Sequence, residues 1–399
     1  MNSRWNQFVH HVIGVHNAVP DRIVRHEDIQ LSIQQDTPEL AGWTCEFWRI
    51  PVKFFHMHTI NVGDPTDIDL DHIEDQTSQA WQLEDASIVF NVYSRSDPLT
   101  AANAHVTIFS HGINQQFVVN RQLINLAKTD NNGLASNVKF AMKRIEYLLA
   151  LCQTNTFIVY EYPLFGFDDT SRSSGFFSEA NAALALKYVI DHVRFKMNIS
   201  SRHINLIGYS FGTGPTIRMA RYFDINCAFL MAPYTNLFNT TMTIPSFITL
   251  RRSGSLASLE HIKHVCCPIL FMHGTNDNII DCNHSTTLYK NLPPSIKIKS
   301  LLFFYPCDHS VLSSLIANAN WADPIKLFLR NSDAKYVDAS FFDIMPDRAL
   351  VVCDSEKLKF QTRIVSIAFV VALFVIGVWI MRTPRKVTTE QTAEKKDSA

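Results

Sequence analysis

Several features that mark other classes of protein are missing from this sequence. Its charges nearly cancel, with 36 lysines and arginines against 37 aspartates and glutamates, so it lacks the basic surplus that binds nucleic acid. Its eight cysteines include no C-x-x-C pair and no spacing typical of a zinc site. We therefore predict reduced thiols in a cytosol-facing protein, with no metal, no cofactor and no nucleic-acid partner.

The first twenty residues lack the sustained apolar run of a secretory signal peptide. Near the other end, a long stretch of the sequence lacks charge. Residues 364–381 contain no charged side chain and lie between Arg363 and Arg382. This length is close to the minimum for a helix that crosses a bilayer. We predict a single transmembrane helix over 364–381, with a polar tail over 382–399. The alternative is a buried core helix.

A membrane helix this close to the C-terminus predicts a tail-anchored, single-pass protein whose main domain faces the cytosol. The partner of the protein would be the lipid bilayer. The short length of the predicted helix favours a thin membrane such as that of the endoplasmic reticulum. Residues 331–363 would connect the anchor to the rest of the chain. The basic residues after the helix are also compatible with the outer mitochondrial or peroxisomal membrane, so the sequence leaves the organelle open, as it does the oligomeric state.

The middle of the chain alternates between short apolar runs and longer helical patterns. We expect strands at 87–93, 104–109, 156–160, 203–207, 228–231, 268–272 and 298–304. We expect helices at 117–128, 138–151, 178–195 and 213–222, with Ser178 as the N-cap of the third. Such alternation predicts an α/β domain over 81–330, with a mostly parallel central sheet and helices on both faces. Residues 1–80 form an extension of uncertain structure, although 43–58 could form a strand.

Gly208-Tyr209-Ser210-Phe211-Gly212 fits the motif G-x-S-x-G and lies between an expected strand and an expected helix. An attacking serine must stand clear of the backbone on a sharp turn. Glycines two residues to either side, here Gly208 and Gly212, leave room for that turn. The placement therefore favours Ser210 as a nucleophile over a chance match.

Two further polar residues follow later strands of the expected sheet, where side chains gather beyond the strands' carboxyl ends. Asp277 follows the strand 268–272, and His309 follows the strand 298–304. His309 would take the proton of Ser210, and Asp277 would orient the imidazole and stabilise its charged form. Asp281 and Asp308 are alternatives to Asp277, and Asp281 is the stronger of the two.

The negative charge that develops on the attacked carbonyl needs backbone donors. Phe211 N–H, directly after the serine, would be the first. The loop His111-Gly112-Ile113 should supply the second, from Ile113 N–H. His111 itself is expected to brace this loop rather than act as a second base.

Five stretches between residues 104 and 330 resemble the α/β-hydrolase superfamily, and within it the Bem46-like and membrane-associated depalmitoylase group. They are Ser110-His111-Gly112, Tyr160-Glu161-Tyr162 with Gly166, Ser178-Glu179-Ala180-Asn181, the serine motif continued through Thr213-Gly214-Pro215, and residues 268–280. The resemblance implies an α/β-hydrolase fold, a triad of Ser210, Asp277 and His309, and hydrolysis of acyl esters or thioesters. The chain departs from the group at Ile113, where an asparagine is usual.

The resulting hypothesis is a membrane-anchored serine hydrolase that acts on a lipid or an acylated protein through an acyl-enzyme. Residues 233–260, which mix apolar side chains with threonines and serines between two expected strands, could cap the acyl chain or could pack as an ordinary loop. A serine peptidase with the same triad and a catalytically silent membrane scaffold are the alternatives.

Overall fold

The computed structural model describes the side chains and backbone of most of the central domain. The described residues are 25–29, 42–55, 83–95, 105–113, 115–129, 132–152, 154–237, 258–296, 299–304, 307–317 and 328. In this part of the chain no helix has the length and apolar character needed to cross a membrane. The predicted membrane helix 364–381, its flanking segments 331–363 and 382–399, and most of the possible cap lie outside the described residues.

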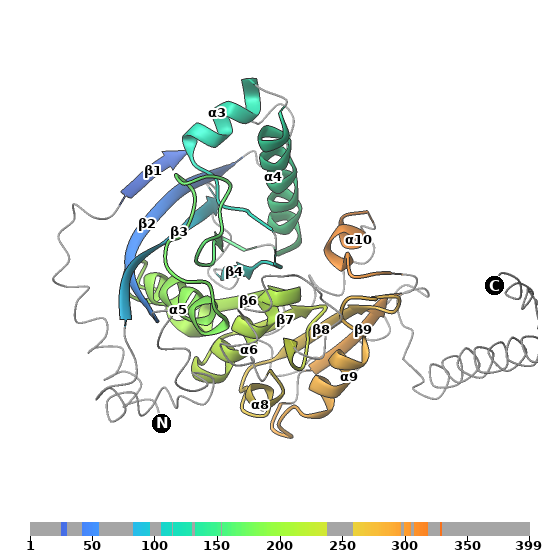
Figure 1. Ribbon diagram of the computed structural model, residues 1–399. Coiled ribbons are helices and arrows are strands. Elements are labelled where there is room, and N and C mark those ends of the chain that lie inside the picture. The colour runs from blue at the N-terminus through green and yellow to red at the C-terminus, as the bar shows by residue number, and fades with distance from the viewer. Residues whose placement is uncertain are drawn as a thin grey trace, which may run out of the picture. The chain divides into compact units, whose positions relative to one another are not determined.

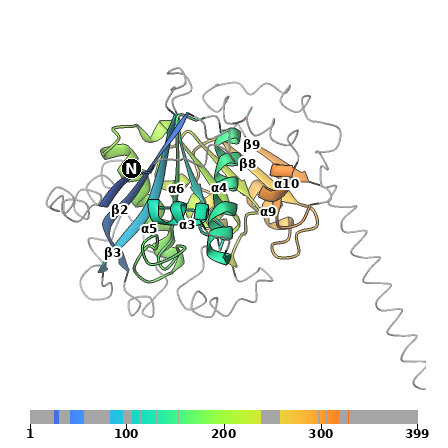
Figure 2. The same ribbon diagram turned by 90° about the horizontal axis from the view of Figure 1, so that it is seen from above.

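A single sheet runs through the described part of the chain, with the strand order β1-β2-β3-β5-β4-β6-β7-β8-β9. Its strands are β1 (Arg25–Ile29), β2 (Trp43–Phe55), β3 (Leu83–Arg95), β4 (Val106–Ser110), β5 (Thr156–Tyr160), β6 (Ile204–Tyr209), β7 (Cys227–Met231), β8 (Ile269–Gly274) and β9 (Lys299–Phe304). The strands fan out when the sheet is seen from above, as the twist of a large sheet requires (Figure 2).

The pairing changes from antiparallel to parallel across the sheet. The pairs β1/β2, β2/β3 and β3/β5 are antiparallel, and the remaining pairs, from β5/β4 to β8/β9, are parallel. The predicted mostly parallel sheet is therefore confirmed. The expected strand at 43–58 is present as β2, and the sheet also takes up β1, so residues before 81 contribute its antiparallel edge.

Helices cover both faces of the sheet, as predicted (Figure 1). One face packs against α3 (Arg121–Thr129), α4 (Gly133–Cys152) and α10 (Val311–Ala317), and the other against α5 (Glu179–Phe195), α6 (Thr213–Tyr222), α8 (Ser258–Ile262) and α9 (Asn283–Lys290). Successive strand residues alternate between the two cores: Ile108 and Leu206 face one, and Phe109 and Ile207 face the other. Every residue of β4 to β8 is buried as a result.

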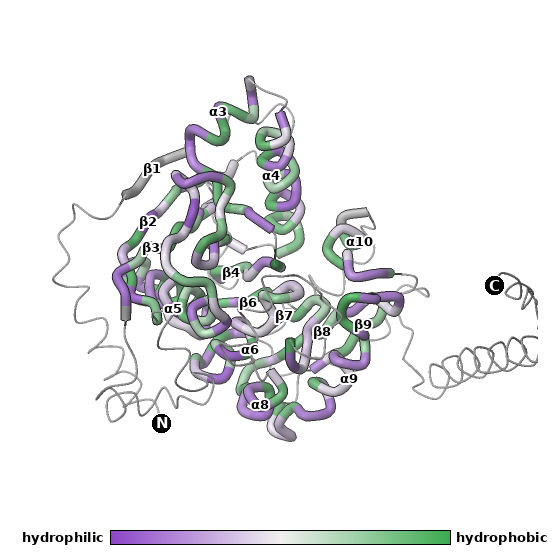
Figure 3. Tube along the Cα trace, in the orientation of Figure 1, coloured by the Kyte–Doolittle hydropathy of each residue, from purple (hydrophilic) through white to green (hydrophobic). Residues whose placement is uncertain are grey.

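The helices follow their sequence signals closely at most ends. Ser178 is the N-cap of α5 and accepts a hydrogen bond from Asn181 N–H, as its position before an apolar pattern predicted. Helix α4 carries apolar and polar residues on separate faces (Figure 3). The helices pack on the two faces of the sheet. The loops that follow the carboxyl ends of the parallel strands lie at its edge.

The expected helix at 117–128 begins four residues late, at Arg121. The reason is tertiary. The N–H groups of Phe117 and Val118 both donate to Oε1 of Glu161, at 2.6 and 2.8 Å, and that of Val119 donates to Oδ1 of Asn91 at 2.7 Å. Because side chains in β3 and directly after β5 accept hydrogen bonds from these N–H groups, the helix starts only after them.

Candidate active site

Ser210 stands on the sharp turn between β6 and α6, where its motif predicted it. Its φ is 52°, in the left-handed region that residues other than glycine rarely adopt. Such strain persists only where the surroundings hold it, and it clusters at functional sites. Residues Ser210–Gly212 form a single 3-10 turn before α6 begins at Thr213. The turn directs the serine side chain toward the loops that follow the neighbouring strands.

The two motif glycines are required by space. A Cβ on Gly208 would lie 2.7 Å from Oγ1 of Thr216 and 2.8 Å from the carbonyl oxygen of Gly212. A Cβ on Gly212 would lie 2.1 Å from the carbonyl oxygen of Ser110. The turn is thus pressed between α6 and the end of β4, and any side chain at either position would push it away.

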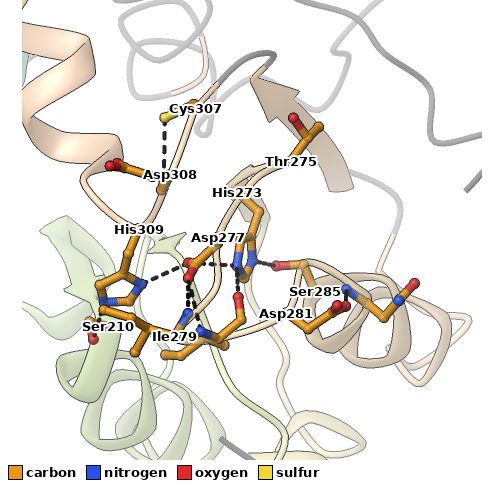
Figure 4. Close-up of polar contacts among 12 residues, drawn as sticks. Ser210, His273, Thr275, Asp277, Ile279, Asp281, Ser285, Cys307, Asp308 and His309 are labelled. Atoms are coloured by element: carbon orange, nitrogen blue, oxygen red, sulfur yellow. Dashed lines mark hydrogen bonds and ion pairs between the residues drawn. The ribbon is translucent and has the colours of Figure 1, made fainter. Parts of the chain in front are cut away.

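The loops after β8 and β9 bring an aspartate and a histidine to this serine (Figure 4). Nε2 of His309 lies 2.9 Å from Oγ of Ser210, and Nδ1 of the same ring lies 2.7 Å from Oδ2 of Asp277. The side chain of Asp277 is fully buried, whereas that of His309 is 16% exposed. The three residues that the sequence singled out therefore form one continuous line of contacts, although 99 residues separate Ser210 from His309.

Both oxygens of Asp277 accept hydrogen bonds. Oδ1 accepts from the N–H groups of Ile279 and Ile280, each at 2.9 Å, and Oδ2 faces His309 at 2.7 Å and His273 at 3.2 Å. Burial on its own raises the pKa of Asp277, but the hydrogen bonds from His273, His309 and the Ile280 amide outweigh it and hold the pKa well below the usual range. The carboxyl group is therefore ionised at neutral pH and can stabilise a charged imidazole.

The rival carboxylates are occupied within their own loops. Oδ1 of Asp281 accepts from Asn283 N–H at 2.7 Å, and Oδ1 of Asp308 accepts from Ser310 N–H at 2.7 Å. In Figure 4 the side chain of Asp308 points away from the line of contacts. Of the three aspartates, Asp277 is the one in contact with His309.

The loop after β4, which contains Ile113, lies directly against the serine turn. The carbonyl group of Ser110 and the carbonyl oxygen of His111 supply the three atoms closest to the space beside Gly212. Phe211, the other expected backbone donor, immediately follows the serine and is buried. The two expected donors, Phe211 N–H and Ile113 N–H, thus belong to segments that pack on each other.

A buried polar pair lies behind this loop. Nε2 of His111 is 3.2 Å from Oε2 of Glu161, both side chains are fully buried, and Nδ1 of His111 is 2.8 Å from the carbonyl oxygen of Gly112. The hydroxyl of Tyr162 donates to the carbonyl oxygen of His111 at 2.8 Å. His111 therefore braces the loop, in line with its expected role.

Aromatic side chains surround the residue after the serine. The rings of Tyr162 and Phe177 lie 5.2 and 5.4 Å from that of Phe211, and Phe165 lies 4.9 Å from Phe177. Leu164, next to this group, has a φ of 69° and is one of the exposed large apolar residues. The surroundings of Phe211 are apolar, and its ring belongs to the core on that face of the sheet.

Sequence reasoning missed three residues that support the site. His273 contacts Asp277, Glu161 holds the segment before α3, and the hydroxyl of Tyr209 donates to the carbonyl oxygen of His309 at 2.9 Å. Each of the three lies inside or beside a motif. Its contact, however, is with a residue far along the chain or in the next turn, and a motif does not reveal such a contact. Within the described part of the chain, no group of three or more histidine, cysteine, aspartate or glutamate residues could hold a metal ion.

A mostly parallel sheet with a serine on a strained strand-to-helix turn, and with an aspartate and a histidine after later strands, is the arrangement of the α/β-hydrolase fold. No family model matches the chain. It is 27% identical over 125 residues to α/β-hydrolase domain-containing protein aho-3 of Caenorhabditis elegans, a match that covers 31% of this chain and 37% of that protein.

It is also 27% identical over 138 residues to α/β-hydrolase domain-containing protein 17C of Mus musculus, covering 35% of this chain and 41% of that protein. The chain thus spans about two fifths of the length of these curated relatives. Among solved structures, it is similar to the esterase Pf2001 of Pyrococcus furiosus, with a TM-score of 0.44, 14% identity, and coverage of 62% of this chain and 88% of that one. The sequence matches confirm the resemblance to the α/β-hydrolase superfamily.

Proposed function

We propose that this protein is a serine hydrolase that cleaves acyl esters or thioesters through an acyl-enzyme. One observation carries the proposal: Ser210, His309 and Asp277 contact one another in the order that nucleophilic catalysis needs, at 2.9 and 2.7 Å. The strained backbone at Ser210 and the ionised state of buried Asp277 support the same reading.

The reaction begins when Oγ of Ser210 attacks the acyl carbon while Nε2 of His309 takes its proton. Asp277 accepts the Nδ1–H of the imidazole and stabilises the positive charge that the ring gains. The tetrahedral intermediate then collapses, the bond to the leaving group breaks, and His309 gives its proton to the departing oxygen or sulfur. An acyl-Ser210 ester remains.

Hydrolysis of this ester repeats the steps with water. His309 removes a proton from water, the hydroxide attacks the acyl carbon, and the proton returns to Ser210 as the carboxylic acid leaves. In both halves the carbonyl oxygen becomes negative, and the N–H groups of Phe211 and Ile113 are the donors we assign to it. Removing one such donor costs about 100- to 1,000-fold in rate in a well-studied protease.

We infer a fatty acyl group held at a membrane surface as the substrate. The resemblance to the depalmitoylase group supports a thioester on a protein or an ester in a lipid. The apolar segment 364–381 would anchor the enzyme beside such substrates, facing the cytosol. An anchor raises the local concentration of substrates in the same membrane.

The test is labelling by a fluorophosphonate probe, followed by a panel of ester and thioester substrates of different chain lengths. Ser210→Ala should abolish both labelling and hydrolysis, because the attacking oxygen is gone. Losses of about a millionfold accompany removal of the serine of a triad. Ser200→Ala, which changes an exposed serine, is the matched control and should leave both intact. Hydrolysis that persists in purified Ser210→Ala would exclude the proposed nucleophile.

A further inference from the structure

Tyr209, the residue before the serine, contacts the loop that holds the histidine. It is the last residue of β6 and only 6% exposed. Its hydroxyl donates to the carbonyl oxygen of His309 at 2.9 Å, and its ring lies 5.7 Å from the imidazole, inclined by 30°. The strand that supplies the nucleophile is therefore tied directly to the segment that supplies the base.

The same ring also touches the loop after β4. A Cβ on Gly112 would lie 3.2 and 3.3 Å from two carbons of the Tyr209 ring, so the ring lies close against the backbone there. Gly112 immediately precedes Ile113, one of the two expected backbone donors. One side chain thus contacts the loop of the base and the loop of a donor, and it is joined covalently to the nucleophile.

The loop that carries His309 lies between the end of β9 and the start of α10. Contacts with neighbouring segments, such as the hydrogen bond from Tyr209, therefore fix its position. Its other side is held by the β8 loop: Asn276 N–H donates to the carbonyl oxygen of Cys307 at 2.8 Å, and Gly274 leaves no room for a Cβ beside Asp308. Tyr209 supplies the contact from the β6 side. The imidazole is thereby supported from both directions while it bridges the serine and the aspartate.

The protonation state of the Tyr209 hydroxyl suits a structural role. Burial raises the pKa of Tyr209, an effect that Arg144 only partly offsets, so the hydroxyl is protonated at neutral pH and can donate a hydrogen bond. It points to a backbone carbonyl and not to Ser210, so it takes no part in proton transfer.

We propose that Tyr209 is a positioning residue that keeps His309 and the Gly112–Ile113 loop in register with Ser210. The proposal rests on the proposed hydrolase function and deepens it. It predicts that loss of the hydroxyl lowers the rate of the chemical steps through a displaced imidazole, while the affinity for substrate changes little.

The experiment compares two tyrosine-to-phenylalanine variants in the full-length protein. Tyr209→Phe removes the hydrogen bond to His309. Tyr188→Phe is the matched control, because Tyr188 is also buried, at 5% exposed, and its hydroxyl also donates to a backbone carbonyl, that of Lys53 at 2.8 Å, but it lies in α5 away from the triad. Tyr209→Phe loses this one hydrogen bond, whereas Tyr188→Phe also loses a longer one that its hydroxyl accepts from Lys53 N–H at 3.3 Å, so the control should lose at least as much thermal stability.

We expect Tyr209→Phe to lower kcat by roughly 3- to 10-fold, the value of one hydrogen bond, with KM nearly unchanged. The rate of fluorophosphonate labelling of Ser210 should fall by a similar factor, which gives a second readout that needs no natural substrate. Tyr188→Phe should keep the wild-type kcat and labelling rate.

Ser210→Ala, measured beside them, separates two kinds of failure. If Ser210→Ala still hydrolyses the ester, the proposed function is wrong, whatever Tyr209 does. If Ser210→Ala is inactive but Tyr209→Phe matches Tyr188→Phe in kcat and labelling rate, the function stands and the positioning role of Tyr209 is refuted.

Discussion

Asp277→Asn gives the sharpest test of the site, because an amide cannot replace this carboxylate in either orientation. Four donors surround the two oxygens: the Ile279 and Ile280 amides at Oδ1, and the imidazoles of His309 and His273 at Oδ2. An asparagine offers one accepting oxygen and one NH₂ donor group. Whichever way it turns, the NH₂ faces a pair of donors.

The expected losses follow from this geometry. If the NH₂ faces His309, the imidazole must turn or change tautomer, and it can no longer act as a base toward Ser210. The equivalent change in a well-studied triad lowers kcat by about 10,000-fold. Two hydrogen bonds to a buried charge are lost as well, and since each is worth about 1.5–3 kcal/mol, the free energy of unfolding should fall by about 3–6 kcal/mol.

The assay measures kcat on a chromogenic acyl ester and unfolding by urea in the same preparations, so that an unfolded variant is not mistaken for an inactive one. Asp281→Asn is the control, because its carboxylate accepts from Asn283 N–H within its own loop. Asp281→Asn should keep kcat within about threefold of the wild-type value, since substitutions of exposed residues away from the catalytic contacts rarely have a large effect. A severe loss in Asp281→Asn together with a mild one in Asp277→Asn would refute the assignment of the acid.

Three further predictions concern the serine turn, acid stability and the C-terminal segment. Gly212→Ala forces a Cβ against Ser110, so we expect a loss of about 1–3 kcal/mol in stability and the loss of most activity. Burial, reinforced by neighbouring arginines, lowers the pKa of His261 to about 3. Because an unfolded histidine binds a proton below about pH 6.5, the free energy of unfolding should fall as the pH drops from about 6.5 toward 3. Truncation after residue 362 should release a folded enzyme that hydrolyses soluble esters but not membrane-held ones.

Each of these predictions has its own check. Urea unfolding and ester hydrolysis measure Gly212→Ala, and wild-type activity in that variant would contradict the crowding argument. His261→Gln keeps an acceptor for Arg221 and removes the titration, so a pH dependence as steep as that of the wild type would exclude His261 as its source. For the truncation, carbonate extraction of the full-length protein should leave it with the membranes, and release by carbonate would contradict an anchor at 364–381.

Local signals were enough to predict much of the domain. The alternation of strands and helices predicted the mostly parallel sheet, because apolar runs of strand length separated by helical patterns can bury their apolar surfaces in few other folds. The helix over 213–222 and the strand over 156–160 were predicted residue for residue, and Ser178 was identified as an N-cap. The late start of α3 was missed, because it depends on Glu161, a residue that only folding brings beside that segment.

The sequence by itself determined which residues could form the site: a serine between glycines after a strand, and an aspartate and a histidine after later strands. These are properties of neighbouring residues and of chain order, and they can be read without coordinates. Only the tertiary structure decided which carboxylate meets the imidazole, that His273 shares it, and that Tyr209 joins the loops of His309 and Gly112. Such contacts depend on the register of parallel strands and on the angles at which loops leave them, and a difference of a few ångströms there separates a hydrogen bond from no contact.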